Sequence, residues 1–109
     1  MSEIVRWSAI ETAQHIRACN VSISEVTQAH LSRLDLANPE LNAVTHLIDE
    51  AVDLAAAMDA KGIPDDASAL YGVPVTVKVN VDMAGYPNTN GIPAFKEMTG
   101  DGDAPVVAN

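Results

Sequence analysis

The chain has 109 residues, of which 48% are hydrophobic, and its formal net charge is −9 at pH 7. This length suits one domain at most, and so acidic a chain lacks the basic surface that nucleic-acid phosphates need, so we expect no nucleic-acid partner. A single cysteine excludes an internal disulfide framework, and no run approaches the roughly 20 apolar residues of a membrane span, so we expect a cytoplasmic protein without a membrane partner.

The first predicted element is a helix over about residues 7–19. Ser8 is followed three residues later by Glu11, which is the spacing of a capping box. We expect Trp7 to pack on the first turn and Asn20 to end the helix in a left-handed conformation. Apolar residues recur on one face at helical spacing: Ile10, Ala13 and Ile16.

Ser22 and Glu25 repeat the capping signal and predict a second helix, which runs to about Leu36. Pro39 is expected to stop it, because proline restricts the residue before it and cannot continue the hydrogen-bond ladder. The inward face is predicted to comprise Ile23, Val26, Leu34 and either Ala29 or His30.

Residues 41–48 are short and β-branched, which indicates a strand. Asp49 then resembles the N-cap of a third helix, which runs to about Lys61 and stops at Gly62. Its inner side is predicted to carry Val52, Ala55, Ala56 and Met58, and residues 63–69 form a surface loop.

Residues 73–82 alternate with a period of two, which is the pattern of a β-strand. One side carries Val75, Val77, Val79 and Val81, and the other carries Thr76, Lys78, Asn80 and Asp82. We expect the strand to bury its valines and to present a polar row with one lysine in the middle.

A lysine in this position has two interpretations. The ordinary one is a solvated side chain on the outer face of a half-exposed strand. The other is a base, which requires desolvation or a nearby cation, because the reference pKa of lysine is about 10.4. Thr76 and Asn80 are neutral neighbours of Lys78, and Asp82 would lie roughly 13 Å away along a strand that rises about 3.3 Å per residue.

Residues 83–102 are rich in Gly, Pro, Asn and Thr and predict a long loop, in which Asn90-Gly91 is a turn signal. Asp103 is expected to cap a further helix with Pro105 in its first turn. The chain ends before that helix completes two turns, so we expect a truncated polypeptide.

No metal or other cofactor is expected. The histidines His15, His30 and His46 are not at a metal-ligand spacing. Asp101 and Asp103 lack the remaining ligands of a calcium loop.

The last third of the chain resembles the amidase signature family. The motifs are L-Y-G-V-P-V-T-V-K-V-N-V-D at residues 70–82, A-G at 84–85, T-N-G at 89–91 and D-A-P-V-V-A at 103–108. They follow the family pattern in order and spacing, except that Val79 stands where the family usually has aspartate. Position 79 points away from Lys78, so we expect this change to alter packing more than the base. Residues 1–62 resemble the helical entry segment of the family more loosely.

The resemblance implies an α/β fold, a mixed sheet covered by helices, with residues 1–109 as the N-terminal part of a single amidase-like domain. This part would comprise a helical entry segment (1–62) and then the loop, lysine strand and following loop (63–109). It also implies a Ser–cis-Ser–Lys triad that cleaves amide bonds without metal, of which only Lys78 is present here. Thr89, Asn90 and Gly91 would lie beside the substrate channel, with ordinary loop packing as the alternative.

Three functions stay open. The chain is expected to be a fragment of an amide hydrolase that is inactive alone and needs a small amide substrate and the remainder of its domain or a complementary chain. Alternatively, it is a non-catalytic acidic accessory or binding module, which compact monomeric behaviour and cooperative unfolding would favour. The third possibility is the A-type subunit of an amidotransferase.

Overall fold

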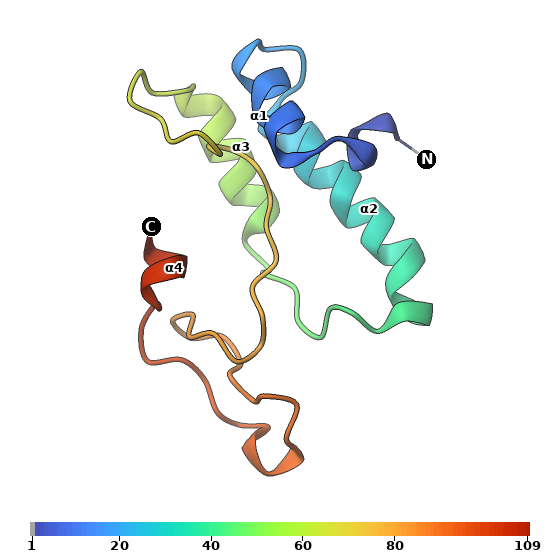
Figure 1. The fold of residues 1–109 in the computed structure, drawn as a ribbon, viewed down its shortest axis with the longest axis vertical. Helices are drawn as coiled ribbons and strands as arrows, with labels where there is room; N and C mark the ends of the chain where they lie inside the picture. The colour runs from blue at the N-terminus through green and yellow to red at the C-terminus, as the bar shows by residue number, and fades with distance from the viewer. Residues whose placement is uncertain (1) are drawn as a thin grey trace. The chain divides into compact units, whose positions relative to one another are not determined.

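The computed structural model describes residues 2–109, which divide into two compact units. One unit reaches to Pro74, and the other spans Val75–Asn109. The first unit holds η1 (Glu3–Arg6), α1 (Ala9–Arg17), α2 (Ile23–Leu41) and α3 (Ala51–Lys61), and the second holds η2 (Pro93–Phe95) and α4 (Pro105–Ala108) (Figure 1).

The predicted α/β class is wrong for the residues that the structure describes, because every regular element among them is a helix. Residues 73–78 are irregular and join no strand ladder within the described chain, where only two isolated bridges occur. Alternation determines which side chains share a face, but a strand also needs a partner backbone. The side chain of Val75 is consequently 72% exposed and that of Val77 is 38% exposed.

Both predicted capping boxes are confirmed, and they explain where α1 and α2 begin. Glu11 accepts from the Ser8 backbone N–H at 2.7 Å, and Ser8 Oγ accepts from the Glu11 N–H at 3.2 Å. Ser22 and Glu25 exchange the same pair of bonds at 2.8 and 3.0 Å. Each box provides acceptors for N–H groups that the first turn of a helix otherwise leaves unpaired.

The end of α1 differs by one residue from the prediction. Cys19, not Asn20, takes the left-handed conformation, with a φ of 55°. The Asn20 N–H donates to the His15 carbonyl at 3.0 Å, and the Cys19 N–H donates to the Ile16 carbonyl at 3.0 Å. This is a Schellman motif, in which the left-handed residue Cys19 directly follows the C-cap residue Ala18.

The prediction that Pro39 stops α2 is wrong, because the helix continues to Leu41. Pro39 lies in the last turn, where its missing N–H removes a single ladder bond. The turn is completed by the Asn42 N–H, which donates to the Asn38 carbonyl at 2.7 Å, and Asn42 ends the helix with a φ of 50°.

The predicted strand at residues 41–48 is also wrong. Its place is taken by an irregular segment that the side chain of Asn38 holds, because its amide donates to the Val44 carbonyl at 2.8 Å and accepts from the Val44 N–H at 2.9 Å. The Asn38 side chain therefore provides the hydrogen bonds that the Val44 backbone was expected to make with a neighbouring strand. The third helix starts after Glu50 and not after Asp49, and it ends at Gly62 as predicted.

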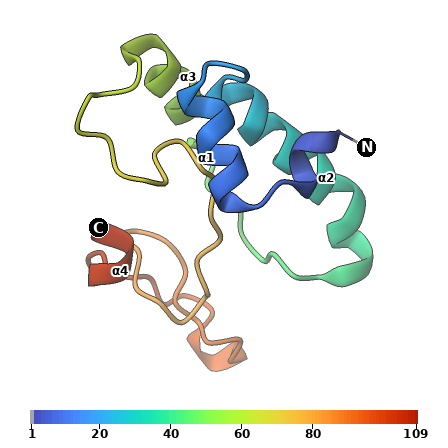
Figure 2. The ribbon, with the colours of Figure 1, turned by 45° about the horizontal axis from the view of Figure 1, so that its top comes forward.

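The core of the first unit lies where α1 and α3 meet the first half of α2, and both views show these three helices together (Figures 1 and 2). It consists of Ile16, Ile23, Val26 and Ala55, with Met58 and Tyr71 packed against it. Three residues predicted to face inward are exposed instead: Ile10 (67% exposed), Val52 (45% exposed) and Ala56. Trp7 stacks on His15, with ring centroids 4.1 Å apart, instead of packing on the first turn.

The loop after α3 is tied to this core before the lysine segment begins. Arg17 donates to the carbonyls of Ala67 and Ser68 at 3.1 and 2.7 Å. Gly72 has a φ of +83° and lies so close to Ile23 that an added Cβ would be 2.7 Å from its Cγ1 atom. Only glycine fits this close approach, so Gly72 holds the end of the loop against the start of α2.

Candidate active site

Lys78 lies at the end of the segment that runs from Val73, and its side chain is exposed. The Val81 N–H donates to the Lys78 carbonyl at 2.9 Å, so the chain turns at residues 78–81. The strand predicted to run straight to Asp82 is therefore interrupted directly after the lysine. The described residues leave this amine in contact with solvent, so the desolvation that a base needs is not provided by them.

Asp82 follows the turn and receives two hydrogen bonds. Its backbone carbonyl accepts from the Ala104 N–H at 2.9 Å, and its carboxylate Oδ1 accepts from the side-chain amide of Asn88. A straight strand would separate Lys78 from Asp82 by roughly 13 Å, and the turn shortens that path. The carboxylate is instead engaged by the amide of Asn88.

The loop after Asp82 folds back on itself. The Gly85 N–H donates to the Gly100 carbonyl at 2.9 Å, and the Gly100 N–H donates to the Tyr86 carbonyl at 3.0 Å. Gly100 is buried, and a Cβ added there would be 2.7 Å from the Met83 carbonyl oxygen. Backbone hydrogen bonds of this kind connect the two ends of residues 82–104.

The turn predicted at Asn90-Gly91 is confirmed. Both residues have positive φ, 49° and 69°, and the Ile92 N–H donates to the Thr89 carbonyl at 2.9 Å. Two positive φ values in succession are typical of a type I′ turn. Thr89 Oγ1 accepts from the Gly91 N–H at 3.2 Å, which fixes the orientation of its hydroxyl group.

Asp103 has a different role from the one predicted. The N-cap of α4 is Ala104, and Asp103 Oδ1 instead accepts from the Ala84 N–H at 2.8 Å. Pro105 is in the first turn of α4, as predicted. Asp103, at the end of the loop, thus contacts Ala84 near the start of the loop, close in sequence to Asp82.

The structure brings the predicted site residues into one unit without joining them directly. The hydrogen bonds shown for Lys78 stay within the 78–81 turn, and those of Thr89 stay within the 89–92 turn. Sequence reasoning missed Asn88, whose amide engages Asp82. The sequence showed only that Asn88 lies in an Asn-rich stretch, and this did not indicate Asp82 as its partner.

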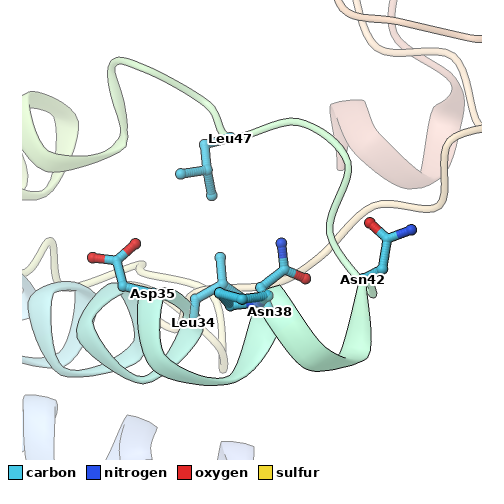
Figure 3. A pocket seen from close by; sticks show the side chains of 6 residues that line it. Leu34, Asp35, Asn38, Asn42 and Leu47 are labelled. Atoms are coloured by element: carbon cyan, nitrogen blue, oxygen red, sulfur yellow. The ribbon is translucent and has the colours of Figure 1, made fainter.

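A separate hollow of about 330 Å³ lies in the first unit, beside the end of α2. Leu47 points from the loop toward Leu34, with Asp35, Asn38 and Asn42 around the opening (Figure 3). The sequence did not predict this hollow, because it depends on the segment that Asn38 holds.

Three carboxylates have pKa values below their ordinary range, and all three accept hydrogen bonds from residues at the N-terminus of a helix. Hydrogen bonds from Ser8 to Glu11, and from Ser22 to Glu25, lower the pKa of each glutamate. Partial burial raises the pKa of Asp59, but hydrogen bonds from Ser24 and Ile23 together outweigh this effect and lower it. These perturbed groups lie in the first unit and serve helix capping.

Among residues 2–109, no group of three His, Cys, Asp or Glu side chains is placed to hold a metal ion. None of the helices described has both the length and the apolar character needed to cross a bilayer.

Comparison with known proteins identifies the family. Residues 25–109 match the Amidase family profile. The chain is 47% identical over 108 residues to the indoleacetamide hydrolase of Bradyrhizobium diazoefficiens, which covers 95% of this chain and 20% of that protein. It is 34% identical over 109 residues to the A-type subunit of the glutamyl-tRNA(Gln) amidotransferase of Renibacterium salmoninarum, covering 98% of this chain and 21% of the relative.

A third relative is the fatty-acid amide hydrolase 2-A of Danio rerio, which is 34% identical over 110 residues, 93% of this chain and 21% of that protein. No solved structure matches the chain. The chain spans about a fifth of the length of these relatives. On the profile match and these identities, the chain belongs to the amidase signature family.

Proposed function

We propose that the chain is the N-terminal part of an amide hydrolase in which Lys78 accepts the proton of the nucleophile. The observation that carries the proposal is the position of Lys78 within the region that matches the Amidase profile. The side chain of Lys78 is exposed among the described residues, so the remainder of the enzyme would have to desolvate it for the amine to act as a base.

The reaction proposed is acyl transfer. A serine outside these 109 residues attacks the amide carbonyl, and a second serine relays its proton to uncharged Lys78. Lys78 then returns the proton, through the same relay, to the leaving amine. Backbone N–H groups stabilise the oxyanion of the tetrahedral intermediate. Thr89, Asn90 and Gly91 shape one wall of the substrate channel.

We propose a small aryl-acetamide as the substrate class, on the basis of the 47% identity to a protein named indoleacetamide hydrolase. The partner is the remainder of the amidase domain, either in the same polypeptide or as a complementary chain. The relative lengths support this, because each relative has about four times more chain beyond the matched region.

A hybrid enzyme tests the proposal. The matched part of the Bradyrhizobium indoleacetamide hydrolase is replaced by this chain, and hydrolysis of indoleacetamide is measured. Lys78→Ala should lower kcat by about 10²–10⁴-fold, the usual contribution of a general base. Lys78→Arg should be equally impaired, because arginine keeps its proton.

Lys96→Ala is the matched control, since Lys96 is also an exposed lysine of the second unit. It should retain the turnover of the unaltered hybrid. Turnover of Lys78→Ala equal to that of the control would exclude Lys78 from the reaction.

A second candidate is the A-type subunit of an amidotransferase, because relatives with that name are 34% and 44% identical to this chain. The two candidates differ in what the complete protein needs. A hydrolase releases ammonia from a free amide without other chains, whereas the A-type subunit of an amidotransferase is active only with its partner chains.

A further inference from the structure

The contacts around Asp82 have no role in the proposed reaction, although they lie next to Lys78 in the chain. Asp82 accepts the Asn88 amide through Oδ1 and the Ala104 N–H through its carbonyl oxygen at 2.9 Å. We refer to Asp82, Asn88 and Ala104 as the Asp82 cluster. The Asp82 cluster connects the end of the lysine turn to the end of the loop that follows.

The turn brings Asp82 closer to Lys78 than a strand would. A turn with a hydrogen bond between its first and fourth residues has its end Cα atoms within about 7 Å. Lys78 and Val81 are these two residues, and Asp82 comes next. A carboxylate turned toward the lysine amine at this position would stabilise its positive charge, which opposes the use of the lysine as a base.

We propose that Asp82 and Asn88 are positioning residues for Lys78: their hydrogen bond holds the 78–81 turn against the 82–104 loop and keeps the Asp82 carboxylate directed toward Asn88. This inference rests on the proposed function of Lys78. Asn88 acts as the donor, and it satisfies the carboxylate without bringing a positive charge into the site.

Other titratable groups of the second unit are Tyr86, Lys96, Glu97, Asp101 and Asp103. Asp103 is held by the Ala84 N–H at 2.8 Å, on the same loop closure as the Asp82 cluster. Asp101 is exposed and serves as a control acid.

The first experiment uses the 109-residue chain itself. Amide hydrogen exchange is measured at Gly85, Gly100 and Ala104, the N–H groups that close the loop. Asp82→Ala and Asn88→Ala should each accelerate exchange several-fold. The double variant Asp82→Asn with Asn88→Asp reverses donor and acceptor and should restore slow exchange. Exchange that is unchanged in both single variants would overturn the structural half of the inference.

The second experiment measures the pH dependence of kcat in the hybrid enzyme. Asn88→Ala and Asp82→Ala should each lower kcat about tenfold, because both release the loop. Only Asn88→Ala leaves the Asp82 carboxylate in place and free to turn toward Lys78, so only there should the acidic limb of the profile move to higher pH.

A merely structural role predicts equal losses of activity in the two variants and no movement of the limb to higher pH in Asn88→Ala, and this result would overturn the inference. Asp101→Asn is the control and should match the unaltered hybrid. The outcomes separate the two proposals. An unaltered hybrid without activity, or an active Lys78→Ala, counts against the proposed function. An inactive Lys78→Ala with identical profiles for Asn88→Ala and Asp82→Ala counts against the positioning role alone.

Discussion

Asp59 should contribute measurably to the stability of the first unit, although it lies at the protein surface. It accepts hydrogen bonds from the Ile23 N–H at 2.8 Å, the Ser24 N–H at 2.9 Å and the Ser24 hydroxyl at 2.5 Å. Its carboxylate therefore joins the last turn of α3 to the first turn of α2. Together with the capping box, it gives every N–H group of residues 22–25 an acceptor.

The cost of Asp59→Ala follows from this geometry. Losing the side-chain acceptor at a helix N-terminus costs about 0.5–2 kcal/mol, and losing a negative charge there costs about 0.3–1 kcal/mol. Because Asp59 is exposed to solvent, which screens its charge, we expect a total of about 1–2 kcal/mol. In a unit of this size each kcal/mol lowers Tm by about 4–8 °C, so Tm should fall by roughly 4–16 °C.

Thermal unfolding followed by the helical circular dichroism signal measures this effect. Asp65→Ala removes the same charge from an exposed loop of the same unit and is the matched control. Asp59→Asn keeps one acceptor without the charge and should be intermediate. If Asp59→Ala has the same Tm as Asp65→Ala, the assignment of Asp59 as the connection between α2 and α3 is wrong.

The remaining predictions concern acid and the second unit. Hydrogen bonds lower the pKa values of Glu11, Glu25 and Asp59 in the folded chain. The stability that these carboxylates contribute is therefore complete above their unfolded pKa values of about 4–4.5, and it is lost as the pH falls through their folded pKa values. The free energy of unfolding, measured by urea titration, should therefore fall below about pH 4.5, less steeply in Asp59→Ala, and a flat profile down to about pH 3 would contradict this. Gly100→Ala should accelerate amide exchange at Gly85, because its Cβ would lie 2.7 Å from the Met83 carbonyl oxygen. Gly102→Ala is the control and should not accelerate exchange, because no atom lies within 4 Å of a Cβ added there. Equal exchange rates in the two variants would contradict the close contact at Gly100.

The parts of the fold that the sequence predicted correctly are local. A capping box depends on side chains three residues apart, so Ser8 and Ser22 were sufficient to locate the starts of α1 and α2. The turn at Asn90-Gly91 likewise depends on the φ preferences of two residues. The family motifs were also readable directly, because they are defined by residue order.

The parts that failed depend on partners distant in the sequence. The valines around Val77 favour an extended backbone, but no rule of alternation provides the second strand that a ladder requires. Asn38 took the place of such a partner for Val44, which no spacing rule foresees. At the candidate site, Lys78 was identified, whereas the pairing of Asp82 with Asn88 depends on how the whole loop closes.

The most direct test of Lys78 as the base is chemical rescue of the Lys78→Ala hybrid enzyme. Two small primary amines of different basicity, ethylamine and trifluoroethylamine, are added, and indoleacetamide hydrolysis is measured against the concentration of the uncharged amine. If Lys78 transfers the proton, activity should rise in proportion to that concentration and more steeply for the more basic amine. A Lys78→Ala enzyme that hydrolyses indoleacetamide at the unaltered rate without any added amine would contradict the proposed role of this lysine.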